Sequence, residues 1–126
     1  MPKTALCDHH DHRPMPDREA TDAEIEAAAT LFQALSDPAR LRLIVLISNQ
    51  EVCVSELVAV TGEKMTAVSQ RLTLLHRHHL LIRRREGKHI YYRLADDHVL
   101  LLAKNALSHA TETASTRNRV SKESAT

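Results

Sequence analysis

The chain has 126 residues, 43% of them hydrophobic, and a formal net charge of +1. This length and composition predict a single globular domain rather than a disordered chain, and no apolar run approaches the ~18 residues of a membrane span. The N-terminus has no apolar signal region, and two widely spaced cysteines do not make a disulfide framework. We therefore expect a cytoplasmic protein with reduced thiols and no membrane partner.

The small net charge hides an uneven distribution. Residues 1–36 carry three Lys or Arg against seven Asp or Glu, a net charge of −4, whereas residues 64–93 carry eight against one, a net charge of +7. A basic middle between acidic or neutral ends indicates a surface for a polyanion. A solvated run of charge is the alternative.

Residues 1–20 are predicted to form a flexible arm, because they contain three prolines and few apolar residues. Within the arm, residues 7–12 combine one thiol, three imidazoles and two carboxylates. The potential metal ligands with nitrogen or sulfur donors are Cys7, His9, His10 and His12. This composition is typical of a metal-binding tract, and an ordinary polar tail is the alternative.

Periodic apolar residues predict helices over about 21–35, 38–48, 53–62 and 65–78. Thr21 and Glu24 form a capping box at the start of the first helix. Pro38 stands in the first turn of the second helix, and Gly62 is the expected C-cap of the third.

The third and fourth of these helices, joined by a Gly-containing turn, form a helix-turn-helix pattern. Met65, Val68, Leu72 and Leu75 form the expected buried face of the longer helix. Its outer face would enter the major groove and contact bases or phosphates. This face carries Thr66, Ser69, Gln70, Thr73 and Arg77, and Arg71 lies on its flank. The candidate contacts are Thr66, Ser69, Gln70, Arg71 and Thr73. A solvated amphipathic helix pair is the alternative.

Residues 81–94 predict a β-hairpin, because β-branched and aromatic residues flank a turn at Gly87. The tip and the first strand are strongly basic, which makes a wing able to lie along DNA phosphates. The basic residues in question are Arg83, Arg84, Arg85 and Lys88.

Residues 96–112 predict a final helix with Asp96 or Asp97 as its N-cap. We expect a tail without fixed structure over residues 114–126. One face of the helix is apolar in its middle and carries potential metal ligands at both ends. The residues on this face are His98, Leu101, Leu102, Asn105, His109 and Glu112, with Asp96 beside His98.

A single helix cannot bring His98 and His109 to one metal ion, because eleven residues correspond to about 16 Å of rise. In a two-fold dimer, an antiparallel copy would place Asp96 and His98 of one chain against His109 and Glu112 of the other. Two imidazoles with carboxylates form a good tetrahedral zinc site. An ordinary dimer helix with solvated His and acidic side chains is the alternative.

Several segments together make a specific pattern: residues 35–43, 51–57, 67–69, 86–94 and the C-terminal Asp-x-His with His-x-x-Glu. By this pattern, residues 21–113 resemble the ArsR/SmtB family of metal-sensing winged-helix repressors. The resemblance implies a mainly α fold with a β-hairpin wing, that is, a homodimeric winged helix-turn-helix. It also implies that the metal-free dimer binds double-stranded operator DNA and that Zn(II) releases it. The residues that match the family's zinc ligands are Asp96, His98, His109 and Glu112.

The chain departs from the family at Cys53-Val54-Ser55, where many members have Cys-Val-Cys. The arm could compensate, so a second site for Zn(II), Cd(II) or Pb(II) is expected from Cys7, His9, His10, His12 and Cys53. For Cys53, a small buried residue at a helix start is the alternative. Two other functions stay open: a Cd/Pb sensor that uses this second site, and a metal-buffering protein that works through its arm. Co(II) is a further candidate effector.

An enzyme is not expected. The sequence contains no nucleophile elbow, no Gly-rich phosphate loop and no His-Glu-x-x-His motif.

Overall fold

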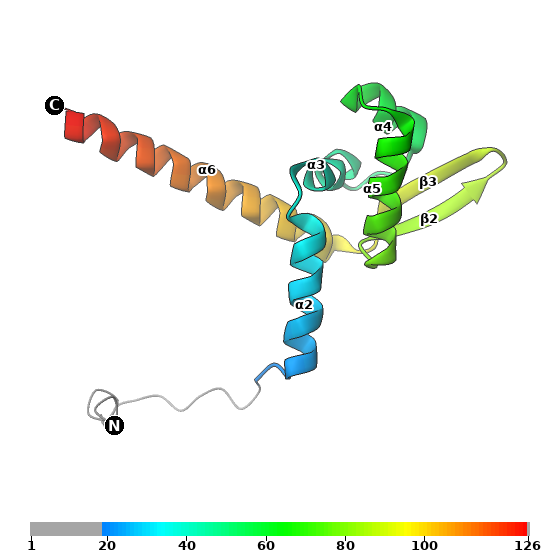
Figure 1. The fold of residues 1–126 in the computed structure, drawn as a ribbon, viewed down its shortest axis with the longest axis horizontal. Coiled ribbons are helices and arrows are strands. Elements are labelled where there is room, and N and C mark those ends of the chain that lie inside the picture. The colour runs from blue at the N-terminus through cyan, green and yellow to red at the C-terminus, as the bar shows by residue number, and fades with distance from the viewer. Residues whose placement is uncertain (1–18, 126) are drawn as a thin grey trace.

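The computed structural model describes residues 19–125. Its elements in chain order are α2 (Asp22–Leu35), α3 (Pro38–Ile47), β1 (Val52–Cys53), α4 (Val54–Thr61), α5 (Met65–Arg77), β2 (Leu81–Glu86), β3 (His89–Leu94) and α6 (Asp97–Ala125). Helices α3, α4 and α5 form a body with β1 and the adjoining ends of β2 and β3. Helices α2 and α6 and the free end of the hairpin of β2 and β3 project from this body (Figure 1). The predicted metal-binding tract of residues 7–12 lies outside the described residues.

The helix ends follow the predicted capping chemistry. The Thr21 hydroxyl accepts a hydrogen bond from the Glu24 N–H at 3.1 Å, and the Glu24 carboxylate accepts one from the Thr21 N–H at 2.9 Å. The Asp37 carboxylate caps α3 by accepting from the Arg40 N–H at 3.1 Å. Gly62 ends α4 with a φ of 71°, a conformation that glycine adopts without strain.

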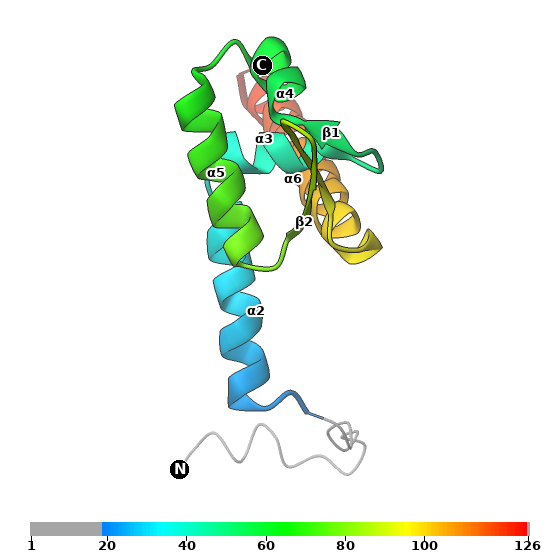
Figure 2. The same ribbon diagram turned by 90° about the vertical axis from the view of Figure 1, so that its right-hand side faces the viewer.

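The strands form one antiparallel sheet in the order β1-β3-β2. Figure 2 labels β1 and β2 of this sheet. The predicted hairpin is confirmed, with Arg84 of β2 opposite Tyr91 of β3 and a turn at Gly87. On the other side of β3, Cys53 of β1 also lies opposite Tyr91. The sequence did not predict β1, because a strand of two residues is too short to show an alternating pattern.

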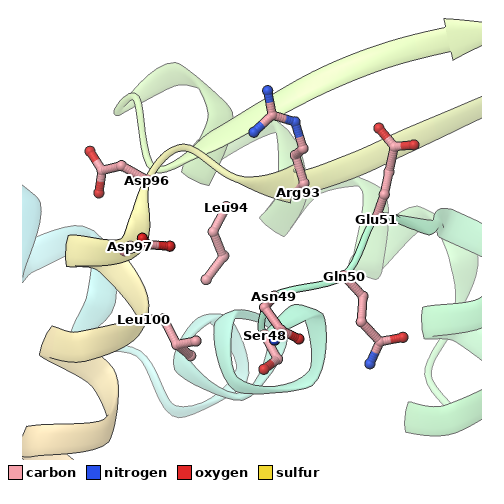
Figure 3. Close-up of a pocket in the computed structure, with 9 residues that line it drawn as sticks. All are labelled: Ser48, Asn49, Gln50, Glu51, Arg93, Leu94, Asp96, Asp97 and Leu100. Carbon is pink, nitrogen blue, oxygen red and sulfur yellow. The ribbon is translucent and has the colours of Figure 1, made fainter.

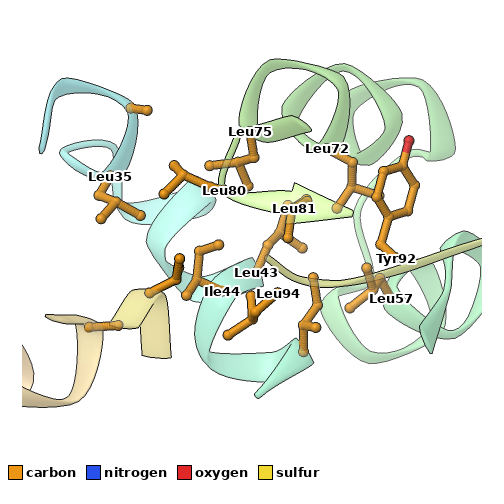
Figure 4. Close-up of a cluster of buried hydrophobic side chains, with 14 of the residues drawn as sticks. Leu35, Leu43, Ile44, Leu57, Leu72, Leu75, Leu80, Leu81, Tyr92 and Leu94 are labelled. Carbon is orange, nitrogen blue, oxygen red and sulfur yellow. The ribbon is translucent and has the colours of Figure 1, made fainter. Parts of the chain in front are cut away.

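An aliphatic core joins α3, α5 and the sheet (Figure 4). Its largest fully buried side chains are Leu43, Ile44, Ile47, Val68, Leu72, Leu75 and Leu80. The predicted buried face of α5 is thus confirmed except for Met65, whose side chain is 53% exposed. Met65 lies in the first turn of α5 and lines a cavity beside the hairpin instead of covering the core.

We expect Leu72→Ala to lower the free energy of unfolding by about 2–5 kcal/mol, because a fully buried leucine leaves a cavity that its neighbours fill only in part. Urea denaturation followed by circular dichroism measures this change. Thr73→Ala, at the next and exposed position, is the matched control and should change it by less than about 0.5 kcal/mol. A loss below about 1 kcal/mol for Leu72→Ala would contradict this placement of the core.

Helix α6 begins where predicted but extends further. The Asp96 Oδ1 atom accepts a hydrogen bond from the Val99 N–H at 3.2 Å, so Asp96 and not Asp97 caps the helix. The prediction of a tail without fixed structure from residue 114 is wrong for residues 114–125, because α6 continues to Ala125. Residue 126 lies outside the described residues. Neither Gly nor Pro interrupts this segment, and nothing in its sequence therefore stops the helix. None of the described helices is both long enough and apolar enough to cross a membrane.

Candidate functional site

The outer side of α5 is the first candidate surface for DNA. The predicted contacts on it are exposed at Thr66, Gln70 and Thr73 and half-buried at Ser69. Their short polar side chains have the chemistry to hydrogen-bond base edges or phosphates. Arg71 is half-buried, and its guanidinium pairs with the Glu63 carboxylate in the turn before α5. This ion pair ties Arg71 to the turn that sets the start of α5.

A basic surface joins α5 to the hairpin. Arg83 of β2 lines a surface hollow together with Thr73 and Arg77 of α5. Arg85 is on the same side of β2 as Arg83, because alternate residues of a strand point the same way, and both line a hollow with Ile90. Such a surface suits the phosphate backbone of DNA. Arg77 lies on the predicted outer face of α5, opposite its buried face, and is exposed.

Arg84 has a different environment from its two neighbours. Its guanidinium donates two hydrogen bonds to Glu51, from Nε to Oε2 at 3.1 Å and from Nη2 to Oε1 at 2.6 Å. A third goes from Nη1 to Glu86 Oε2 at 2.7 Å, and the Cζ atom lies 4.8 Å from the centre of the Tyr91 ring. Hydrogen bonding to Arg84 lowers the pKa of the Glu51 carboxyl, and the two carboxylates raise the pKa of Arg84. Lys88, in the hairpin turn, is exposed.

The predicted zinc ligands form two pairs on α6. At the start of the helix, His98 Nδ1 lies 3.5 Å from Asp96 Oδ1, and the His98 side chain is 87% exposed. Further along, His109 and Glu112 are exposed and line a common hollow. Each pair supplies one imidazole and one carboxylate, which is half of a zinc ligand set.

One chain does not bring the two pairs together, since an ideal helix separates His98 from His109 by about 16 Å. Among the side chains that the structure describes, no three from His, Cys, Asp or Glu are grouped so that they could hold a metal ion. Between the pairs, Leu101 is 57% exposed, whereas the buried residues Val99 and Ala103 belong to the core side of α6, which contacts α3. The face that carries the ligand pairs is therefore uncovered in the single chain.

A cavity of about 370 Å³ lies beside the first ligand pair (Figure 3). Its walls are the α3–β1 loop over residues 48–51, the end of β3 with Arg93 and Leu94, and the first turn of α6. Figure 3 shows Leu94 and Leu100 approaching the same space from β3 and α6. The sequence did not predict this cavity, because the α3–β1 loop is far along the chain from the other two walls, which follow one another in sequence. The start of α6, the end of the hairpin strand β3 and the α3–β1 loop therefore border one common cavity.

Cys53 is buried at the start of α4. Its N–H donates to Glu56 Oε1 at 3.1 Å, and its Sγ lies 3.0 Å from the Ser55 hydroxyl oxygen. It lines a cavity of about 240 Å³ between α4, α5 and the hairpin, to which Met65 and His89 also contribute. Of the second predicted metal site, Cys53 alone falls among the described residues, and its partners Cys7, His9, His10 and His12 lie outside them.

Solved structures share this architecture. The AntR antimony-specific transcriptional repressor superimposes with a TM-score of 0.68 at 32% sequence identity, over 85% of this chain and 99% of that one. The homodimeric winged helix-turn-helix DNA-binding domain Mb0332 from Mycobacterium bovis gives a TM-score of 0.66 at 31% identity, over 80% of this chain and 92% of that one. The predicted winged helix-turn-helix fold is confirmed.

The fold and the basic surface beside α5 define a winged helix-turn-helix DNA-binding protein. The transcriptional repressor SmtB homolog of Synechocystis is 39% identical to it over 89 residues, which are 71% of this chain and 67% of that repressor. The chain belongs to the ArsR/SmtB family of metal-sensing winged-helix transcriptional repressors, as its motifs predicted.

Other relatives agree with this assignment, although no family model matches the chain. The cadmium resistance transcriptional regulatory protein CadC homolog of Staphylococcus aureus is 35% identical over 88 residues, which are 69% of this chain and 73% of that protein. The relatives are transcriptional regulators, which confirms that the chain is a regulator and not an enzyme.

Proposed function

We propose that this chain is a cytoplasmic, zinc-responsive repressor whose metal-free homodimer binds operator DNA. Zn(II) binds between the two chains and lowers the affinity of the dimer for the operator. The observation that carries this proposal is the uncovered face of α6, which has a ligand pair at each end of an apolar stripe.

The apolar residues left uncovered in one chain support the dimer. Leu101 and Leu102 on α6 and Ile25 and Phe32 on α2 are all exposed large hydrophobic side chains. Apolar side chains gathered on projecting helices favour association with another surface. The similar domain from Mycobacterium bovis is homodimeric. A two-fold axis near the middle of the stripe would pack leucine against leucine and place the ligand pairs opposite one another.

The donor set fits zinc. Each intersubunit site would combine Asp96 and His98 of one chain with His109 and Glu112 of its partner, which gives two imidazoles and two carboxylates. Bound Zn(II) would join the two helices through these side chains. Co(II) accepts the same ligands and is a suitable spectroscopic probe of the site.

The position of Asp96 connects the site to the rest of the fold. The same carboxylate that would bind the metal accepts the Val99 N–H and so holds the first turn of α6. This turn borders the cavity whose other walls include the end of β3, the second strand of the hairpin. A metal that binds the non-DNA-binding arrangement more tightly shifts the population toward it, and a coupling of ~3 kcal/mol lowers operator affinity by more than a hundredfold.

Zinc titration of the metal-free protein on a fluorescent copy of its own promoter tests this proposal by anisotropy. Release of the DNA by zinc supports it. Release by Cd(II) or Pb(II) alone would contradict it and favour the second candidate function.

The second candidate is a Cd(II) or Pb(II) sensor that uses Cys53 with Cys7, His9, His10 and His12. Similarity to the cadmium resistance regulator from Staphylococcus aureus supports it. In this case deletion of residues 1–12 should abolish the metal response, while substitutions of His98 and His109 should leave it intact. A metal-buffering protein would instead show no salt-sensitive, sequence-specific DNA binding.

A further inference from the structure

The three consecutive arginines of β2 differ in their surroundings, and this difference separates their roles. We propose that Arg84 is a positioning residue that holds the wing, defined as residues 81–94, at a fixed angle to the body and does not contact DNA phosphates. Arg83 and Arg85 are then the phosphate contacts of this strand. The inference rests on the DNA-binding part of the proposed function and does not depend on the metal.

The sheet register shows why Arg84 is suited to this role. Arg84 and Cys53 lie opposite Tyr91 from the two sides of β3, so one row crosses all three strands at this level. Beyond this row, toward the hairpin turn, β3 pairs with β2 alone. A two-stranded ribbon by itself is marginally stable in water. Arg84 therefore lies at the base of the free part of the wing, where a link to the body has the greatest effect on its direction.

The link reaches a segment outside the hairpin. Glu51 belongs to the loop between α3 and β1, 33 residues before Arg84 in the chain, and takes two hydrogen bonds from its guanidinium. Glu86 takes another within the hairpin, and the Tyr91 ring lies beneath the cation. Isolated surface ion pairs contribute little, but a bidentate pair in a network with an aromatic ring has a defined geometry.

The same contacts make Arg84 a poor partner for DNA. Two carboxylates already pair with its single positive charge, and a phosphate would have to displace at least one of them. Alternation along β2 points Arg84 to the opposite side from Arg83, which shares a hollow with Thr73 and Arg77 of α5. The side of the wing that continues the α5 surface therefore belongs to Arg83 and Arg85.

Arg84→Lys, Arg84→Ala and Arg83→Ala separate the two roles when operator affinity is measured by anisotropy over a range of salt concentrations without metal. The salt slope is the steepness with which log affinity falls as log salt concentration rises, and loss of one phosphate contact lowers it by about 0.9. Arg83→Ala should therefore lower the slope by about 1.8 in a dimer with two wings. We expect Arg84→Ala and Arg84→Lys to weaken binding alike, by about tenfold, and to lower the slope alike, because a wing without its link to Glu51 loses phosphate contacts of Arg83 and Arg85. Lysine does not restore them, since it keeps the charge but loses the planar fork. A wild-type affinity or a wild-type slope for Arg84→Lys would overturn the proposal, because a residue that acts only through its charge would be replaced by lysine without loss.

Glu51→Gln gives a second test, because a role of Glu51 through its charge alone and a role in holding Arg84 predict opposite changes in operator affinity. Removal of an acidic group near DNA should tighten binding if Glu51 acts only through its charge. If it holds Arg84, Glu51→Gln should weaken binding, and the double variant with Arg84→Ala should be no weaker than Arg84→Ala alone. Tighter or unchanged binding would overturn the proposal.

Hydroxyl-radical footprinting of the same complexes distinguishes positioning from a general effect on the fold. For Glu51→Gln and Arg84→Lys we expect protection of the phosphates under the wing to be lost and protection around α5 to remain, with an unchanged thermal unfolding midpoint. Uniform loss of protection, or a lowered midpoint, would overturn the proposal. Because no metal is present, a negative result here leaves the zinc titration unaffected, and failure of zinc to release DNA leaves this test unaffected.

Discussion

Replacing both His98 and His109 by alanine should abolish zinc-induced release of operator DNA and leave metal-free operator binding unchanged. The two imidazoles supply half of each proposed ligand set, and two carboxylates alone bind zinc weakly in competition with water. Both histidines are exposed on α6, so their removal opens no cavity in the core. Anisotropy titrations of the variant on the operator, with zinc added in steps, measure the effect. We expect the zinc-dependent decrease in affinity, more than a hundredfold at ~3 kcal/mol of coupling, to disappear.

Lys104→Ala is the matched control, because Lys104 is exposed on the same helix but is not on the ligand face. It should release DNA at the same zinc concentration as the unchanged chain. Zinc-induced release that persists in the double histidine variant would contradict the proposed site.

A mixture of the two single variants tests whether each site draws ligands from both chains. In a heterodimer of His98→Ala with His109→Ala, one site loses both histidines and the other keeps its full set. Isolated heterodimers should therefore bind one zinc ion with near-normal affinity, while each homodimeric variant binds none tightly. Co(II) absorption of the heterodimer gives an independent count of intact sites. If every ligand came from one chain, no intact site would form in the mixture.

Leu101→Glu should convert the dimer into monomers and weaken operator binding by more than a hundredfold. Leu101 is 57% exposed in the single chain and lies on the apolar stripe between the ligand pairs. In an antiparallel pairing it would meet the apolar stripe of the partner, so the substitution would bury a carboxylate without a partner. A monomer binds a single half-site of the operator. It lacks the second, linked DNA-binding domain that binds the other half-site at a high effective concentration.

Light scattering after size exclusion gives the oligomeric state, and anisotropy gives the operator affinity. Val60→Glu on α4 is the control for oligomeric state, since it places the same charge at an exposed apolar position away from α6. A Leu101→Glu chain that remains dimeric would show that another surface makes the dimer.

Much of the fold could be predicted because its determinants are close together in sequence. The capping box of Thr21 and Glu24 spans four residues, and the Asp37 cap and the Gly62 end of α4 act within one helical turn. The buried stripe of α5 and the hairpin around Gly87 follow from periods of 3.6 and 2 residues. The end of α6 was misplaced, since a polar composition was taken as a tail although nothing in that segment breaks a helix.

The partners of the arginine side chains could not be predicted from sequence patterns. Arg71, Arg83 and Arg84 are equally basic in the sequence, and all three were predicted to contact DNA. Arg71 pairs with Glu63 in the turn before its helix, and Arg84 pairs with Glu51, 33 residues away. Packing alone brings such partners together, because the attraction between side chains depends on their separation in space and not along the chain.

The sequence by itself determined the winged helix-turn-helix elements, since these depend on local periodicity and capping. Its motifs carried the resemblance to the family, and its residue chemistry identified the potential zinc ligands. Only the tertiary structure decided which arginine belongs to the α5 surface, that β1 joins the sheet, and that a cavity lies between Asp96 and the strand of the wing. It also showed that the α6 face with both ligand pairs stays uncovered in one chain. These features depend on how segments of the chain pack against one another, and the hydrophobic periodicity of one segment does not show which other segments contact it.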